Sequence, residues 1–173
     1  MSNLYKICQI RQLEASAISE GHDSETSLMN KAGKAAFLAM QARWPEVKSI
    51  LVICGKGNNG GDGRVLADLA KQAGLAVTMI TIRHHQFFKN SQKTGVNITK
   101  LALSEMGHFD VMIDALLGIG IQNDVSADYQ YVIEQINAIK KPVLSIDVPS
   151  GIDADTGNVM AVAVKADVTS TFL

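Results

Sequence analysis

The sequence has few cysteines, few prolines and little net charge, and each shortage excludes a class of protein. Two distant cysteines in 173 residues do not form the disulfide framework of a small secreted domain. A formal net charge of −1 provides no basic surface for nucleic acid. No apolar run approaches the roughly 20 residues that span a bilayer, and none at the N-terminus resembles a signal peptide. We therefore predict a cytoplasmic chain that binds neither nucleic acid nor membrane.

What the chain does contain is an alternation of short apolar runs and amphipathic segments. A hydrophobic content of 47% and a length of 173 residues suit a single domain with a sizeable core, covering residues 1–173. The segment 87–106 is weakly patterned and is expected to be helical in part, and 161–171 is expected to supply one or two strands. The remaining predictions are strands at 49–54, 76–82, 109–114 and 142–146 and helices at 10–19, 26–43, 62–73 and 127–139.

This alternation predicts an α/β fold, a three-layer αβα Rossmann-like sandwich with a mostly parallel sheet. The run 49–54 is continuously apolar, as in a strand that is covered on both faces, and it ends at Cys54, which we expect to be a buried thiol. Ligands of such sheets bind beyond the carboxyl ends of the strands, near the switch in strand order. The loops 55–63, 114–124 and 147–157 should meet there, and their convergence predicts a site.

The first loop carries the spacing Gly55-x-Gly57-x-x-Gly60 between a strand and a helix. This is the dinucleotide-binding fingerprint in its proper context, and the glycines allow the backbone to approach a phosphate closely. The loop also contains Asn58, Asn59 and Asp62. These three residues are explained either by turn formation alone or by a polar pocket.

The residues at the end of the second predicted strand argue against an ordinary dinucleotide dehydrogenase. An acid is expected there to bind a ribose, but Arg83 and His84 follow instead. A nucleotide-binding oxidoreductase would also need a second, substrate-binding domain. It therefore remains only a third interpretation.

Acidic residues end the third and fourth predicted strands. Asp114 is explained equally well by the capping of a turn and by a functional role. Asp147 ends a strand at the expected site and is the better catalytic candidate. Asp153 and Asp155 are more typical of a solvated turn. Ser150 lies in no nucleophile elbow and has no evident paired base, which argues against a hydrolase triad.

Together the three loops resemble the N-terminal domain of the YjeF family, the NAD(P)H-hydrate epimerases. The match extends from a helix motif at Leu28-Met29 with Ala32-Gly33 to the late strand 165–172. Its most specific parts are the first and third loops. The matching loop sequences are Gly55-Lys-Gly-Asn-Asn-Gly-Gly-Asp-Gly63, Asp114-Ala-Leu-Leu-Gly-Ile-Gly120 and Asp147-Val-Pro-Ser-Gly-Ile-Asp-Ala-Asp-Thr-Gly157.

The resemblance implies an isomerase of nicotinamide nucleotide repair. Such an enzyme interconverts the R and S forms of the hydrates NADHX and NADPHX, so that a partner dehydratase using ADP or ATP repairs the S form. From its position at a strand end facing the cleft, Asp147 is our first candidate for the catalytic proton-transfer residue, with Asp62 a distant second. The substrate-binding residues that the resemblance implies are Asn58, Asn59, Gly60, Gly61, Asp62, Gly118, Ile119, Gly120, Ile121, Gln122, Asn123, Asp124 and Asp147.

A potassium ion is the cofactor that the resemblance implies, beside the positions Asn59, Asp114 and Ser150. An amide oxygen, a carboxylate and a hydroxyl are hard oxygen ligands, which suit a hard cation rather than zinc. Such an ion would partly neutralise Asp114 or a phosphate and order the three loops.

The chain also departs from the family pattern. Asn30 and Lys31 stand where an acid usually follows Leu-Met, and the segment 122–125 lacks an expected proline. The family domain usually continues for tens of residues past the position of Leu173, so a segment of the domain is expected to be missing. A non-catalytic nucleotide- or protein-binding module of the same fold is the runner-up hypothesis. Family members are often dimers, which leaves a homodimer as one expectation.

Overall fold

A seven-stranded sheet forms the centre of the computed structural model, which describes residues 5–83, 86–89, 96–97, 108–121 and 123–172. The strand order is β4-β3-β2-β1-β5-β6-β7. Strands β2, β1, β5, β6 and β7 pair in parallel, whereas β3 and β4 pair antiparallel at one edge. The strands are β1 (Ser49–Cys54), β2 (Ala76–Arg83), β3 (Gln86–Lys89), β4 (Val96–Asn97), β5 (Val111–Ala115), β6 (Val143–Ile146) and β7 (Val168–Ser170).

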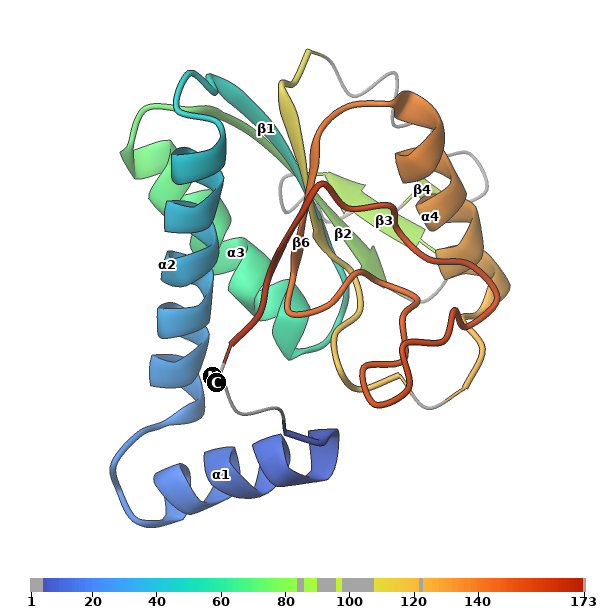
Figure 1. Cartoon of the computed structure of the whole chain (residues 1–173). Helices are drawn as coiled ribbons and strands as arrows, with labels where there is room; N and C mark the ends of the chain where they lie inside the picture. The colour runs from blue at the N-terminus through green and yellow to red at the C-terminus, as the bar shows by residue number, and fades with distance from the viewer. Residues whose placement is uncertain (1–4, 84–85, 90–95, 98–107, 122, 173) are drawn as a thin grey trace.

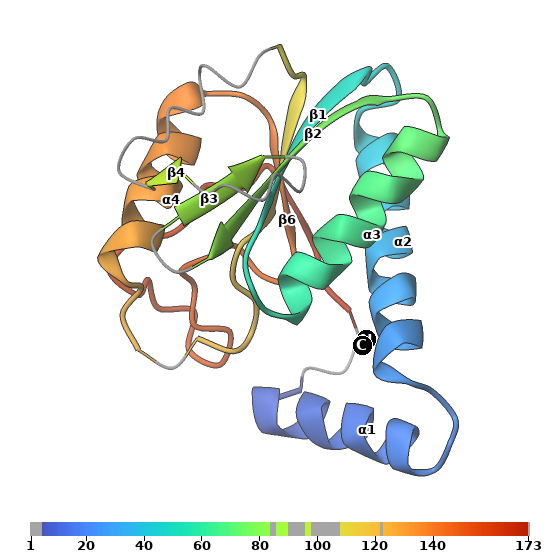
Figure 2. The same ribbon diagram turned by 180° about the vertical axis from the view of Figure 1, so that it is seen from behind.

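Helices cover both faces of this sheet, which confirms the predicted three-layer α/β fold. Helices α2 (Glu25–Arg43) and α3 (Asn58–Gln72) pack together on one face, and α4 (Ala127–Ile139) covers the other (Figures 1 and 2). Helix α1 (Ile7–Ser19) lies apart, across the lower end of the molecule in Figure 1.

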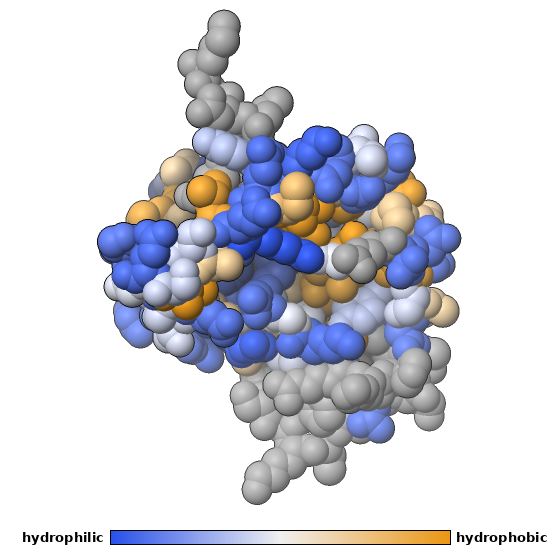
Figure 3. All heavy atoms as spheres, turned by 90° about the horizontal axis from the view of Figure 1, so that it is seen from below, coloured by the Kyte–Doolittle hydropathy of each residue, from blue (hydrophilic) through white to orange (hydrophobic). Residues whose placement is uncertain are grey.

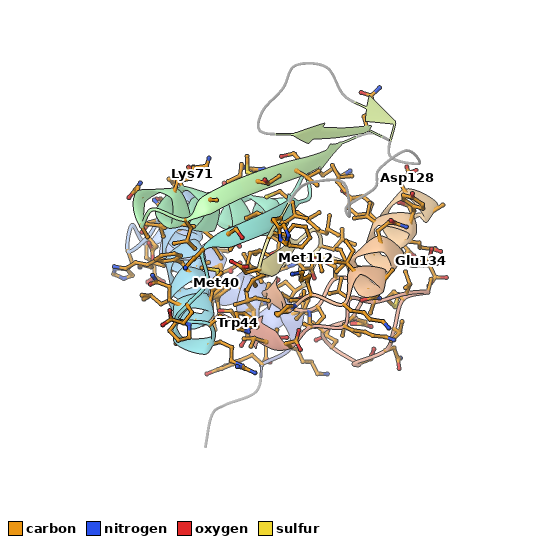
Figure 4. The ribbon with its side chains drawn as sticks, turned by 90° about the horizontal axis from the view of Figure 1, so that it is seen from above. Met40, Trp44, Lys71, Met112, Asp128 and Glu134 are labelled. Carbon is orange, nitrogen blue, oxygen red and sulfur yellow. The ribbon has the colours of Figure 1, made fainter. Side chains whose placement is uncertain are left out.

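The two faces of β1 supply the two halves of the core. Ile50 and Val52 pack with α2 and α3, while Leu51 and Ile53 pack toward α4, as the two-residue period of a strand requires. All four are at most 1% exposed, so the expected covering of this strand on both faces is confirmed. Figure 4 shows the layers from above, with Met112 in the middle and the labelled side chains of α4 at its outer surface.

One sequence prediction needs correction, and another is tested only in part. The segment 87–106 was expected to be helical in part, but its described residues are strands: 86–89 form β3, which turns back antiparallel along β2 with Ile80 opposite Lys89, and 96–97 form β4. Residues 90–95 and 98–107 lie outside the described part, so the expectation is not tested there. Helix α3 begins at Asn58 rather than near Asp62, because Gly57 is its N-cap.

The strand order changes direction between β1 and β5. From β1 the chain passes through α3 to β2 on one side, and it later returns to β5 on the other side. The carboxyl ends of β1 and β5 therefore flank the switch point, where doubly wound sheets bind ligands.

Among the described residues, no helix is both long enough and apolar enough to cross a membrane.

Candidate active site

The glycine loop after β1 is folded tightly against the end of β5. The Gly55 N–H donates to the Ala115 carbonyl at 2.9 Å, and a Cβ on Gly60 would collide with the Gly55 carbonyl oxygen. Residues from Asn58 to Gly61 thus form the first turn of α3, whose free N–H groups favour an anion nearby. Figure 3 shows this side of the molecule from below, with hydrophilic side chains gathered along its middle.

Asp114 is a fully buried carboxylate that joins the end of β5 to the loop after β6. Its Oδ1 accepts from Ser150 Oγ at 2.6 Å, and its Oδ2 accepts from Ser145 Oγ at 2.7 Å and from the Ser150 N–H at 2.9 Å. Burial raises the pKa of Asp114, and these hydrogen bonds lower it in part. The carboxylate therefore holds two of the three predicted loops in register.

Asn59 and Ser150 meet at the backbone of Leu117. Asn59 Nδ2 donates to the Leu117 carbonyl at 2.9 Å, and the Leu117 N–H donates to Ser150 Oγ at 2.9 Å. Asn59 is 7% exposed, and its Oδ1 has no hydrogen-bond partner among the described residues. A buried amide oxygen without a donor is costly unless something else satisfies it, and a cation does so. The predicted metal residues Asn59, Asp114 and Ser150 are thus brought together.

Asp147 is held in an unusual backbone conformation directly after β6. Its φ of 71° lies in the left-handed region, which aspartate tolerates better than most residues and which is often occupied at functional sites. Its Oδ2 accepts from the Ile119 N–H at 2.8 Å, and a Cβ on Gly118 would collide with that same oxygen. Burial, and to a smaller degree Glu14, raises the pKa of Asp147.

Asp62 is the second acid of the site, and its pKa is raised as well. Burial, the neighbouring carboxyl of Asp147 and then Glu14 raise its pKa to about 7, against a smaller lowering by Arg64. A carboxyl with such a pKa exchanges its proton readily at neutral pH. Two carboxyls in different environments are suited to divide the roles of acid and base.

The other predicted substrate-binding residues differ in their exposure. Gly60 and Gly61 are buried, Gly118, Ile119 and Ile121 are half-buried, and Asn58, Gly120, Asn123 and Asp124 are exposed; Gln122 lies outside the described residues. Asp153 accepts from the Asp155 N–H at 2.9 Å and from Thr156 Oγ1 at 2.8 Å, as expected for a turn. Cys54 is buried, as predicted, and burial raises its pKa to about 12.

Two residues of α1 that the sequence analysis did not single out also reach the site. Glu14 influences Asp62 and Asp147, and Arg11 Nη2 lies 3.7 Å from the place that a Cβ on Gly120 would take. Helical periodicity alone predicts the helix, but it does not predict which loops the helix lies against.

Comparison with known sequences identifies relatives over nearly the whole chain. A family profile described as YjeF-related protein N-terminus matches residues 25–173. The chain is 44% identical to the bifunctional NAD(P)H-hydrate repair enzyme Nnr of Coxiella burnetii, over 100% of this chain and 37% of that protein. It is 41% identical to the NAD(P)H-hydrate epimerase of Limosilactobacillus fermentum, over 84% of this chain and 73% of the relative.

A third relative and a solved structure extend this comparison. The NAD(P)H-hydrate epimerase of Legionella pneumophila is 32% identical, over 98% of this chain and 68% of the relative. The crystal structure of yeast ynu0 superposes with a TM-score of 0.80, covering 97% of this chain and 79% of that chain at 19% identity. At that identity the structural likeness shows the fold alone.

Proposed function

Because the chain belongs to the family described as YjeF-related protein N-terminus, we propose that it is an NAD(P)H-hydrate epimerase, interconverting the R and S forms of NADHX and NADPHX. The relatives from L. fermentum and L. pneumophila carry the name of that activity. The observation that supports the proposal best is the pair of carboxyls, Asp62 and Asp147, with raised pKa values at the switch point of the sheet.

The chemistry of the reaction explains why a pair of carboxyls is useful. Inversion at a carbinolamine carbon requires the hydroxyl to leave and return on the other face, or the ring to open and close again. In the first route, an acid protonates the departing hydroxyl, which leaves as water while the ring nitrogen's electron pair forms a C=N bond. Water then adds to the opposite face and gives its proton to a base. The carbon gains and loses one hydroxyl, so the reaction consumes nothing.

Asp147 is our first candidate for a proton-transfer group. Its carboxylate is fixed by the Ile119 N–H at 2.8 Å, and a positioned acid or base contributes about 10²- to 10⁴-fold in rate. Asp62 has a pKa of about 7 and is suited to the complementary step. The remaining substrate contacts come from the first turn of α3 and from the loop 118–124.

We further propose a potassium ion beside Asn59, Asp114 and Ser150. The unpartnered Asn59 Oδ1 supports this assignment, as does the mixture of amide, carboxylate and hydroxyl oxygens, which favours a hard cation. When bound, the ion would supply positive charge beside the buried Asp114 carboxylate and tie together the loops that these residues come from.

A separate dehydratase that uses ADP or ATP is the proposed functional partner, and residues 1–173 form the proposed epimerase domain. The C. burnetii relative is named bifunctional, and the chain spans 37% of its length. The presence of Asn59, Asp62, Asp114, Asp147 and Ser150 at the candidate site favours catalysis over the alternative of a binding module, which does not need them. We place this activity in the cytoplasm, where nicotinamide nucleotides are used.

The proposal is tested by following conversion of the R hydrate to the S hydrate, with a separate dehydratase as the coupling step. We expect the folded chain to accelerate the conversion, and more so with potassium than with an equal concentration of choline chloride. Heat-denatured protein is the control for the spontaneous reaction. No acceleration by folded protein would favour the binding module.

A further inference from the structure

Helix α1 lies across the carboxyl end of the sheet rather than against the core. None of its residues is buried, and both ribbon views show it apart from the three layers, below the start of α3 (Figures 1 and 2). One hydrogen bond ties its first turn to the loop after β6, from the Ile7 N–H to Asp155 Oδ1 at 2.9 Å. This hydrogen bond thus ties the start of the helix to a loop of the site.

One face of α1 is turned toward those loops. Ile7, Ile10 and Ala17 are its half-buried residues, and their spacing places them on one side of the helix together with Glu14. Arg11 lies on the same side, one turn after Ile7. The distance of 3.7 Å between Arg11 Nη2 and the position of a Cβ on Gly120 shows that its side chain extends to the predicted substrate loop.

The guanidinium of Arg11 is not engaged in holding the fold together. It forms no ion pair within 4.0 Å in the part of the chain that the structure describes. The site carries the carboxyls Asp62 and Asp147, with Glu14 acting on both, and Arg64 offsets only part of this negative charge at Asp62. An anionic ligand is therefore favoured there by a further cation. An arginine is well suited to that task, because its planar fork of donors matches a phosphate and its charge persists at every relevant pH.

We propose that Arg11 is a substrate-binding residue whose guanidinium binds a phosphate of the hydrated nucleotide, so that α1 forms one wall of the substrate site. This inference rests on the proposed function. NADHX and NADPHX share a diphosphate, and NADPHX adds a phosphate on a ribose. Arg11 is placed beside the loop 118–121 to bind one of these groups.

The test measures binding of two probes that lack the nicotinamide ring, ADP-ribose and its 2′-phosphorylated form, by isothermal titration calorimetry. We expect Arg11→Ala to weaken binding about tenfold, as for loss of one charge-assisted hydrogen bond. Arg11→Lys should restore part of the affinity, because it keeps the charge and loses the fork. Gln12→Ala, on the opposite face of the same helix, is the matched control and should bind as the wild type does.

The pattern across the two probes identifies the phosphate. Equal weakening for both assigns Arg11 to the diphosphate, and weakening for the 2′-phosphorylated probe alone assigns it to the ribose phosphate. Either result supports the inference. It is overturned if Arg11→Ala binds both probes as tightly as the wild type, or if the folded wild type binds neither.

Epimerisation kinetics separate this inference from the proposed function. We expect Arg11→Ala to raise KM about tenfold and to leave kcat within about threefold, because the contact is made away from the reacting carbon. If the wild type binds the probes in an Arg11-dependent manner but does not epimerise the hydrates, the proposed function fails and the inference stands. If the wild type epimerises and Arg11→Ala has an unchanged KM and unchanged probe affinity, the inference alone fails.

Discussion

The backbone N–H of Ile119 donates to Asp147 Oδ2 at 2.8 Å, so the loop after β5 fixes the carboxyl that ends β6. This hydrogen bond joins the loop after β5 to the loop after β6, at the place where we expect the substrate to bind. It also leaves Oδ1 of Asp147 without that constraint. The orientation of the candidate catalytic group therefore depends on both loops.

Asp147→Asn is expected to lower kcat for epimerisation by about 10²- to 10⁴-fold, because an amide does not exchange a proton as a carboxyl does. The variant keeps an oxygen that accepts from the Ile119 N–H, so its fold should persist. The measurement is the coupled assay with potassium present, beside a thermal melt. Near wild-type turnover by Asp147→Asn would remove this residue from the mechanism.

Gly118→Ala should damage the site through the same carboxyl. The added methyl group would collide with Asp147 Oδ2 and come within 3.3 Å of Asn59 Cβ, so the loop must shift. Overpacking of this kind costs about 1–3 kcal/mol, and here it also displaces a proton-transfer group. We expect a large fall in kcat with a modest fall in melting temperature. Unchanged kcat in Gly118→Ala would show that the loop rearranges without affecting the chemistry.

Because α2 packs closely against α3, we expect a third substitution, Gly33→Ala, to lower the free energy of unfolding. Alanine is about 1 kcal/mol better than glycine inside a helix. A Cβ on Gly33, however, would lie 2.6 Å from Val65 Cβ and 2.7 Å from the Asp62 carbonyl oxygen. The clash with backbone outweighs the propensity, so Gly33→Ala should destabilise the chain by about 1–3 kcal/mol in urea unfolding. Gly57→Ala, which meets nothing within 4 Å, is the control; equal stabilities for the two variants would contradict the prediction.

The parts of this site that are local in sequence were predictable. The run 49–54 and the glycine spacing after it indicated a buried strand and a phosphate-type loop before any contact was known. The contact between Asp114 and Ser150 depends on which strands are neighbours in the sheet. The predicted fold class specifies that strand order only in outline. The unpartnered oxygen of Asn59 and the pKa of Asp62 depend on burial, which periodicity does not specify.

The departures from prediction have the same origin. The strand at 86–89 exists because β2 offers a free edge, which no pattern within 86–89 reveals. Helix α1 was predicted as a helix, but its place depends on a hydrogen bond between Ile7 and Asp155, 148 residues apart in the sequence. A single sequence gives little indication of contacts between residues so far apart along the chain. These contacts place Arg11 and Glu14 near the site.

The raised pKa of Asp62 predicts a titration near neutral pH. We expect the pH profile of kcat/KM, which reports ionisations of the free enzyme, to show a midpoint near 7 that disappears in Asp62→Asn. Glu14 raises the pKa of Asp62, so Glu14→Gln should move the midpoint to lower pH. Glu20→Gln at the exposed end beyond α1 is the control. The same midpoint in Glu14→Gln and the wild type would show that α1 does not act on Asp62.

Stability should reveal the same ionisation independently of activity. A carboxyl whose pKa is higher in the folded than in the unfolded state stabilises the fold at low pH, and this contribution is lost as pH rises from about 4 through 7. The stability of Asp62→Asn relative to the wild type should therefore increase as pH rises from about 4 to about 7, and stay constant above that. Chemical unfolding at several pH values measures the difference. A difference that does not vary with pH would contradict the raised pKa.

Potassium should stabilise the chain through Asn59. A ligand that binds only the folded state raises its stability with concentration, and the buried Oδ1 of Asn59 offers an unsatisfied oxygen for that purpose. We expect the melting temperature to rise with potassium chloride relative to choline chloride at equal ionic strength, which removes general screening from the comparison. Asn59→Ala should abolish the difference, whereas Asn58→Ala, the exposed neighbouring amide, should retain it. Equal melting temperatures of the wild type in the two salts would contradict this prediction and favour a hydrogen-bond donor of the substrate, rather than a cation, as the partner of Asn59 Oδ1.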